Sequence, residues 1–528
     1  MTPTFGPQPT STHFEAIVVG CGPVGATAAI QLANAGFSVA VVEEHPRPYP
    51  YPRAVMLDAY SCAILAELLG DDYQRISMNR TPGAGYYLDK TNLDRPFAST
   101  GLNLGDHRNW FVQPQLEAIL REVIERHHNI TTYFGATARK LYADDTSTLT
   151  VEHLHSGETT ELTGDYLLGC DGGNSFVRKQ MGGSLIGLGD TVLFLVVDAL
   201  APPDKLAGKP GHAYQVVDRE RPTTFLPMAV DNHCRWEFRI NPDDDILELQ
   251  SPEKIRELLE PWVDLDHLEL LRHTVYKFNS LIASEWRKRN VFVCGDAAHQ
   301  TSPFLGQGLN MGIRNTRNLC QKIELVAAGD ARSELLDRYQ AECFDATKAT
   351  IEEALRMGKL LFNTSTPANL ARSFVGNVIR RGKPIDITGQ LAPEAQMLEA
   401  GRSVPSSVRK VLPQVEVRLE DGTDTMLALV DHTTCKILAT EQDGLDMLKP
   451  LDEVPVTIRP QIYSVVDGFD GGQAGVPLIL TDVEQRKALM GDAGYLVLGE
   501  NSVVIGRYDI GQEAELIADY RQVFELVG

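Results

Sequence analysis

The chain has 528 residues, a length that predicts about three or four domains. Hydrophobic residues make up 43% of the chain and charged residues 23%, which is typical of a folded globular protein and excludes a disordered or fibrous one. The net charge of -22 would repel phosphate backbones and anionic membrane surfaces, so we expect no nucleic-acid partner.

Targeting and metal-binding patterns are missing from the sequence. Residues 1–13 have neither the basic nor the apolar stretch of a secretion signal, and no run of about 18 apolar residues predicts a membrane span. We therefore expect a cytoplasmic protein without a membrane partner. The eight cysteines form no CxxC pair and have no histidine-rich companion at metal-ligand spacing, so we expect no metal site and no dithiol redox centre.

The first recognisable unit is a strand, a helix and a second strand. Residues 14–20 read FEAIVVG, an apolar run typical of a buried parallel strand. Residues 23–35 are apolar around most of a helix, and Gly36 is suited to end that helix. Residues 37–42 predict the second strand. The order predicts a βαβ unit.

A GxGxxG motif, residues 20–25, lies at the first turn of this unit. Gly20 would make the turn, Gly22 would let the backbone approach a pyrophosphate, and Gly25 would let helix and strand pack closely. Glu43 ends the second strand, where it would accept hydrogen bonds from a ribose diol and disfavour a 2'-phosphate. Dinucleotide binding is the prediction and a chance glycine-rich turn is the alternative; the motif does not distinguish NAD from FAD.

Two later segments help to distinguish FAD from NAD. Residues 164–179, the DG segment, read GDYLLGCDGGNSFVRK. Residues 291–310, the GD segment, read VFVCGDAAHQTSPFLGQGLN. Together with the glycine motif they form a GxGxxG, DG and GD pattern across about the first 320 residues. With residues 51–54 (YPRA) and 111–117 (FVQPQLE), the chain resembles the FAD-dependent aromatic hydroxylases of the para-hydroxybenzoate hydroxylase fold. Within them it is most similar to the 3-(3-hydroxyphenyl)propionate hydroxylase branch.

The resemblance implies an α/β fold: a Rossmann-type FAD-binding domain, an inserted antiparallel-sheet substrate domain and a C-terminal thioredoxin-like domain. A Pro-, Ser- and Arg-rich stretch predicts the linker before the last of these. This tail has no CxxC, so we expect it to stabilise the chain or to form a homodimer. The expected division is 14–184 and 281–400 for the FAD-binding domain, with 81–110 partly contributing to the substrate domain, 185–280 for the substrate domain, 401–413 for the linker and 414–528 for the tail.

The resemblance also implies which residues hold FAD. The glycine turn and Glu43 would bind its ADP half, and Arg53 and Gln113 would lie along the pyrophosphate and ribityl chain. Asp296 would bind the ribitol or pyrophosphate region, and backbone amides of residues 306–310 would reach the flavin pyrimidine edge. The expected cofactor-binding residues are Gly20, Gly22, Gly25, Glu43, Arg53, Gln113, Asp171, Asp296, Pro303, Gly306, Gly308, Leu309 and Asn310.

In the family the DG segment is associated with both FAD and the nicotinamide cofactor. The resemblance implies the same association for Asp171 and Arg178. A turn-forming aspartate before glycine is the alternative for Asp171, and a surface charge is the alternative for Arg178. No second Rossmann fingerprint is found, so NAD(P)H is expected as a transient co-substrate. The sequence does not separate NADH from NADPH.

The ring pocket is expected between the DG and GD segments. Residues 191–198 and 235–240 read as strands of a half-buried antiparallel sheet, the second with Arg235, Glu237 and Arg239 on one face and Trp236, Phe238 and Ile240 on the other. The resemblance implies that this sheet covers the flavin. Candidate catalytic or pocket residues are Asp58, Tyr214, Trp236, Phe238, Tyr276 and His299.

Each candidate has a structural alternative: core packing for the aromatic residues, a helix N-cap for Asp58 and a local structural role for His299. After the pocket, residues 315 to about 400 are expected to be helical.

The function that the resemblance implies is hydroxylation of a phenolic ring with NAD(P)H and O2, through a flavin C4a-hydroperoxide. The protein would supply position, a water-poor cavity and charge control rather than a nucleophile. Alternatives are Baeyer–Villiger oxygenation, oxidative removal of a ring substituent, reduction without oxygen transfer, or an FAD-fold protein without enzymatic activity.

Overall fold

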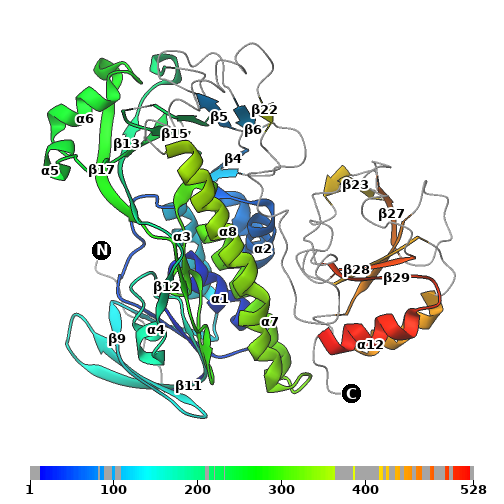
Figure 1. Cartoon of the computed structure of the whole chain (residues 1–528). Coiled ribbons are helices and arrows are strands. Elements are labelled where there is room, and N and C mark those ends of the chain that lie inside the picture. The colour runs from blue at the N-terminus through cyan, green and yellow to red at the C-terminus, as the bar shows by residue number, and fades with distance from the viewer. Residues whose placement is uncertain are drawn as a thin grey trace.

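The structure is a computed structural model, and it has a mixed α/β fold (Figure 1). It describes residues 12–80, 84–87, 98–100, 109–207, 213–218, 220–230, 232–362, 385–386, 416–419, 424–426, 435–440, 445–454, 459–465, 476–480, 494–498 and 504–523.

A mainly parallel sheet forms the centre of the N-terminal part. Neighbours β1, β2, β8, β11 and β20 run parallel, and β9, β10 and β19 add antiparallel edges. Its central strands are buried on both faces, as their continuous apolar runs predict. The strands are β1 (His13–Val19), β2 (Val39–Glu43), β8 (Ile130–Phe134), β9 (Ala136–Ala143), β10 (Ser147–His153), β11 (Thr159–Gly169), β19 (Arg287–Lys288) and β20 (Val291–Val293).

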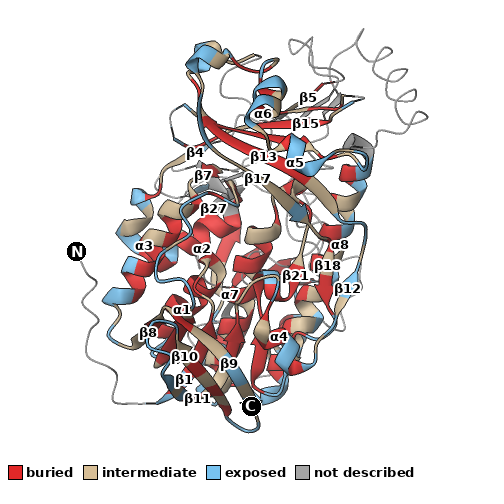
Figure 2. Ribbon diagram, turned by 90° about the vertical axis from the view of Figure 1, so that its left-hand side faces the viewer, coloured by how far each residue is buried: buried red, intermediate tan, exposed pale blue. Residues whose placement is uncertain are grey.

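Helices cover this sheet and complete a first hydrophobic core. Helix α1 (Pro23–Asn34) packs against both α3 (Gln113–Arg126) and α7 (Gly308–Ala327), and α2 (Ala59–Leu69) packs against α7. The predicted βαβ unit is confirmed, since α1 lies between the parallel strands β1 and β2. The buried interior of this part is coloured red in Figure 2.

A second, mostly antiparallel sheet lies above the first core in Figure 1, in the order β17-β13-β16-β15-β14-β5-β6-β22. The two strands predicted in this part are confirmed as the antiparallel neighbours β13 and β16. The strands are β5 (Ala84–Tyr87), β6 (Ala98–Thr100), β13 (Val192–Leu200), β14 (Ala213–Val216), β15 (Thr223–Pro227), β16 (His233–Arg239), β17 (Glu269–Phe278) and β22 (Ile385–Asp386).

One face of this sheet makes a second hydrophobic core. Trp236 and Phe238 of β16 pack there with Leu195 and Phe225, together with residues of α6 (Pro252–Leu259). For β16 the expectation of a half-buried strand is wrong, because its polar face is buried as well: Glu237 is only 8% exposed. That face covers a cavity instead of meeting bulk solvent.

Shorter elements connect the two cores. Two small sheets have the orders β3-β7-β4 and β12-β18-β21. Helix α8 (Arg338–Phe362) follows α7, so the expected helical region is confirmed that far, but β22 shows that it is not helical throughout. The remaining elements are β3 (Met56–Leu57), β4 (Met78–Arg80), β7 (Asn109–Phe111), α4 (Phe176–Met181), β12 (Leu185–Gly187), α5 (Ile246–Leu249), β18 (Leu281–Ala283) and β21 (His299–Gln300).

The C-terminal part contains a further mixed sheet and helix α12 (Glu513–Val523). Its core includes Ile437, Tyr495 and Leu516 and packs against Leu325 and Leu335 from the end of α7 and the turn that follows. The predicted linker 401–413 lies outside the described residues. The strands are β23 (Glu416–Leu419), β24 (Asp424–Met426), β25 (Lys436–Ala439), β26 (Gln461–Val465), β27 (Val476–Leu480), β28 (Tyr495–Leu498) and β29 (Val504–Tyr508).

Among the helices that the structure describes, none has the length and apolar character needed to cross a membrane.

Candidate functional site

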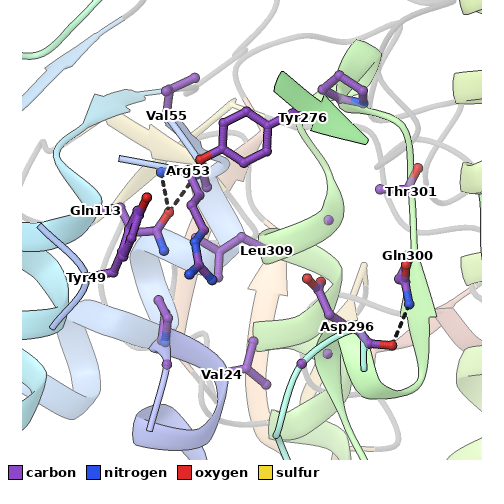
Figure 3. A pocket seen from close by; sticks show the side chains of 18 of the residues that line it. Val24, Tyr49, Arg53, Val55, Gln113, Tyr276, Asp296, Gln300, Thr301 and Leu309 are labelled. Atoms are coloured by element: carbon purple, nitrogen blue, oxygen red, sulfur yellow. Dashed lines mark hydrogen bonds between the residues drawn. The ribbon is translucent and has the colours of Figure 1, made fainter. Parts of the chain in front are cut away.

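A cavity of about 1040 Å³ extends from the carboxyl end of the parallel sheet to the polar face of the second sheet. Its walls come from the GxGxxG turn, the segment after β2, the DG and GD segments, and strands β13 to β17. A cavity at the carboxyl ends of parallel strands is the usual ligand position in such folds. Figure 3 shows part of its lining.

The three glycines of the turn have different surroundings. A Cβ on Gly20, whose φ is +98°, would lie 2.4 Å from the carbonyl oxygen of Cys170, and one on Gly25 would lie 2.0 Å from the carbonyl oxygen of Gly20. A Cβ on Gly22 would meet nothing within 4 Å. Gly22 is also the N-cap of α1 and leaves that end without a side-chain cap. The open space at the positive end of the helix fits a pyrophosphate.

Glu43 is held in the cavity wall at the end of β2. The backbone N–H of Cys21 donates to its Oε2 at 2.7 Å, and that of His45 donates to its Oε1 at 2.8 Å. The two bonds fix a carboxylate whose remaining lone pairs can accept from ribose hydroxyls. Beside the glycine turn, this arrangement fits the adenosine half of FAD.

Arg53 points into the cavity, and Gln113 positions it from behind. The Gln113 Oε1 accepts hydrogen bonds from the backbone N–H groups of Arg53 (3.1 Å) and Ala54 (2.6 Å), as the dashed lines in Figure 3 show. The Arg53 guanidinium lies 4.6 Å from the centroid of the Tyr49 ring. The amide oxygen of Gln113 is therefore engaged by the protein backbone, whereas the Arg53 charge faces the cavity.

The Arg53 segment is also held from the second sheet, by residues that the sequence did not single out for this role. Arg235 donates to the carbonyl oxygens of Pro52 (2.6 Å) and Arg53 (3.0 Å), and Arg272 donates to that of Pro52 (2.7 Å). The carboxylate of Asp198 accepts from both arginines, at 3.0 and 2.8 Å. We call Asp198, Arg235 and Arg272 the Asp198 clamp.

The groups around Asp198 lower its pKa by more than burial raises it. Burial would raise the pKa of Asp198, but the hydrogen bond from His233 and the charge of Arg235 hold that pKa well below its usual range. The clue available in the sequence was the alternation of β16, which put Arg235 on one face without saying what that face meets.

In the DG segment Asp171 and Arg178 have defined structural partners. Asp171 accepts from the Ser175 hydroxyl (2.5 Å) and the Val177 N–H (3.0 Å), so it supports the first turn of α4, whose N-cap is Ser175. Arg178 is buried and donates to the carbonyl oxygens of Ala297 (2.7 Å) and Gly173 (2.9 Å). Arg178 is therefore not a surface charge: it joins the DG segment to the GD segment. Asp171 also lines the cavity.

The carboxylate of Asp296 has no hydrogen-bond donor among the described residues, and it faces the cavity. Desolvation raises the pKa of this carboxyl above its usual value, and the charge of Arg53 offsets part of that rise. Figure 3 shows Arg53, Tyr276 and Asp296 around the same space. Asp296 can therefore accept hydrogen bonds from the hydroxyls of a ligand.

After Asp296 the chain forms the far wall. Pro303, Gly306, Gly308 and Leu309 line the cavity, and Gly306 has a φ of +64° at the turn into α7. Asn310 does not line it. Its amide donates to the Gly306 carbonyl (2.9 Å), and its oxygen accepts from the backbone N–H at the start of α2 (3.0 Å).

Two of the aromatic candidates reach the cavity and two do not. Tyr276 lines it and accepts a hydrogen bond from Arg272 at 3.3 Å. Tyr214 contributes to the lining, but its ring is stacked on Phe225 at 4.6 Å. Trp236 and Phe238 lie on the opposite face, in the second core.

The remaining two candidates lie behind the lining. Asp58 is the N-cap of α2, where it accepts from the Ser61 N–H at 2.8 Å and pairs with Arg314. His299 is 1% exposed and lies 3.2 Å from the Asn315 amide nitrogen. Burial lowers the pKa of His299 to about 4, so the ring is neutral at pH 7.

Comparison with known proteins agrees with this geometry. Residues 13–354 match the family model of the FAD binding domain. The 3-(3-hydroxy-phenyl)propionate/3-hydroxycinnamic acid hydroxylases of Escherichia coli (strain K12) and Shigella sonnei (strain Ss046) are each 31% identical to the chain over 499 residues, covering 88% of this chain and 87% of theirs.

Solved structures share the fold over nearly the whole length. Aklavinone-11 hydroxylase, in a ternary complex with FAD and aklavinone, has a TM-score of 0.75 at 22% identity and covers 97% of this chain and 99% of its own. The flavin-dependent monooxygenase PieE, in complex with FAD and substrate, has a TM-score of 0.74 at 18% identity, with the same two coverages. With its FAD-binding domain and these relatives, the chain belongs to the FAD-dependent aromatic hydroxylases, in the branch of the 3-(3-hydroxyphenyl)propionate hydroxylases.

Proposed function

We propose that this protein hydroxylates a phenolic ring with NAD(P)H and O2. The observation that carries the proposal is the continuity of one cavity. The same space is lined by the GxGxxG turn, which fits a pyrophosphate, and by the polar face of the second sheet. A dinucleotide at the first wall and a ring at the second would therefore share one cavity.

The proposed roles follow from the atoms that face this volume. The N-terminus of α1 at Gly22 and the guanidinium of Arg53 bind the pyrophosphate, Glu43 binds the ribose, and Asp296 binds ribityl hydroxyls. Residues 306–309 line the cavity, and their backbone N–H groups would hold the flavin pyrimidine edge. Bound FAD supplies hydride acceptance and oxygen activation, while the protein orients the ring and excludes water.

The proposal includes the division of the chain given above, with a thioredoxin-like C-terminal domain. Parallel pairing of β25, β26 and β27, with β28 and β29 as an antiparallel hairpin at one edge, supports that comparison. The packing of its core against Leu325 and Leu335 supports a stabilising role.

A panel of phenols offered to the FAD-loaded protein tests the function. The first compound is 3-(3-hydroxyphenyl)propionate, the substrate named for the 31% identical relatives. We expect at least one phenol to stimulate NAD(P)H oxidation and to gain one oxygen atom from isotopically labelled O2. Peroxide is measured alongside, because stimulation with peroxide and without oxygenated product would contradict the proposal.

A further inference from the structure

Glu237 is a carboxylate of the cavity lining that lies on the second sheet, away from the residues proposed to bind FAD. Glu237 lies on β16 between Trp236 and Phe238, which both face the second core. Successive side chains of a strand point to opposite faces, so Glu237 faces the cavity, as Arg235 does when it reaches the Pro52 carbonyl. Glu237 also lines the cavity and is only 8% exposed.

Glu237 has neither a hydrogen-bond donor nor an ion pair among the residues that the structure describes. Its neighbours on the adjacent strands are Val196 and Thr224, which carry no charge. Arg235 donates instead to Asp198 and to backbone carbonyls. Leaving a buried carboxylate without a donor costs free energy, and a ligand that donates would recover it.

The charged groups around Glu237 act in opposite directions. Desolvation raises its pKa most, the charge of Arg235 lowers it, and the charge of Asp198 raises it. On this side of the sheet, the other titratable groups include His233 and Arg239 on the same strand, Arg272 and Tyr276 on β17, and Tyr86 on β5.

A row of residues continues from Glu237 across the sheet. Strand register aligns it with Thr224 and then with Gln215, and all three line the cavity. The amide oxygen of Gln215 is buried and has no hydrogen-bond partner in the described structure. Two strand spacings of about 4.8 Å separate Glu237 from Gln215, so two unsatisfied acceptors lie about 10 Å apart along one row.

We propose that Glu237 accepts a hydrogen bond from a ring hydroxyl of the substrate and thereby selects hydroxylated rings. This inference rests on the proposed function and names the residue that recognises the ring. A poorly solvated carboxylate is a strong acceptor, and it draws the hydroxyl proton toward itself and leaves the ring more electron-rich. The substrate class is a phenol whose own carboxylate, where it has one, lies away from Glu237, because like charges repel.

The test is a binding cycle on the FAD-loaded protein without NAD(P)H. Calorimetric titration compares resorcinol, which has two hydroxyl donors, with 1,3-dimethoxybenzene, which has none. We expect the wild-type protein to prefer resorcinol by about tenfold or more, the value of a hydrogen bond to a charged group. In Glu237→Gln we expect the preference to fall to about threefold or less, because the charge is gone.

Glu269→Gln is the matched control, since Glu269 is an exposed residue at the start of β17, outside the cavity lining. It should keep the wild-type preference. Lowering the pH should reduce the preference in the wild type and leave it unchanged in Glu237→Gln, because protonation of the carboxylate removes the charged acceptor.

Equal preference in the wild type and Glu237→Gln would overturn the inference, and so would a wild type that binds neither compound or does not discriminate between them. If Glu237→Gln does not fold, the wild-type pH series decides, and a preference independent of pH overturns the inference. Failure of the proposed function would be seen separately, as the absence of oxygenated product from every phenol. The binding preference measured by calorimetry does not depend on that result.

Discussion

Arg53 reaches the cavity because its backbone is fixed on two sides. Gln113 accepts hydrogen bonds from the N–H groups of Arg53 and Ala54, and Arg235 donates to the carbonyl of Arg53. The guanidinium stacks on Tyr49, which limits its rotamers without neutralising its charge. A side chain held in this way loses little conformational entropy when it binds an anion.

Replacing Arg53 with alanine should therefore weaken FAD binding by about tenfold or more, since a charge-assisted hydrogen bond is lost. The measurement is titration of the apoprotein with FAD, followed by flavin fluorescence. Arg139→Ala, at a half-exposed arginine of β9 outside the cavity, is the matched control. Equal FAD affinities in the two variants would contradict the position given to Arg53.

His299 makes stability depend on pH. Its pKa is about 4 in the folded protein and about 6.5 in an unfolded chain, so the unfolded state takes up the proton first on acidification. The stability that the neutral ring contributes is full above about pH 6.5 and is lost as the pH falls toward about 4.

We expect the difference in free energy of unfolding between the wild type and His299→Gln to shrink by on the order of 3 kcal/mol from pH 7 to pH 4. Chemical denaturation at a series of pH values measures it. His155→Gln, at an exposed histidine, is the control variant and is measured over the same pH series. A constant difference for His299→Gln would mean that this ring titrates normally.

At the scale of elements, the glycines of the turn between β1 and α1 have two different roles, one in folding and one in cofactor binding. Gly20 and Gly25 are required by close backbone contacts, whereas Gly22 borders open space. Folding and cofactor binding should therefore be lost by different substitutions within six residues of chain.

We predict that Gly22→Ala keeps the melting temperature of the apoprotein within a few degrees and lowers FAD affinity by about tenfold or more, because its methyl group occupies the pyrophosphate position. Gly20→Ala should destabilise the fold itself, since its Cβ would meet the Cys170 carbonyl at 2.4 Å. Gly187→Ala, whose Cβ would meet nothing nearer than 4.0 Å, is the neutral control. Normal FAD binding by Gly22→Ala would exclude the phosphate site proposed here.

At the scale of the whole molecule, the Asp198 clamp ties the two cores together. Asp198 and Arg235 belong to the second sheet, and the carbonyls of Pro52 and Arg53 belong to the segment that leaves the first. The cavity lies between the two, so the clamp also sets the separation of its walls.

Asp198→Asn should lower the free energy of unfolding by about 3 to 5 kcal/mol, because two buried arginines lose their counterion. It should also weaken FAD binding, since the Arg53 segment is released. Thermal unfolding and FAD titration measure the two effects. Asp244→Asn, which removes a partly buried partner of Arg221 away from the cavity, should reduce stability less and leave FAD binding unchanged. If the two variants behave alike, the clamp has no special part in positioning Arg53.

What could be derived from the sequence was the local chemistry of the site. The strand, glycine turn and helix at residues 14–35 follow from short-range sterics and apolar periodicity, and the structure confirms them as β1 and α1. Gly20, Glu43 and Asp296 were placed at strand ends, and the structure brings all three to one cavity. Such features depend on neighbours within a few residues, which the sequence displays directly.

The tertiary structure alone decided what each strand face and each buried polar group meets. Alternation placed Arg235 and Glu237 on one face of β16, but only the packing of that sheet over the cavity removes them from solvent. Asp58 became a helix cap paired with Arg314, a partner 256 residues away. Pairings of this kind arise from the closure of long loops around a shared core, and no local spacing in the chain records them.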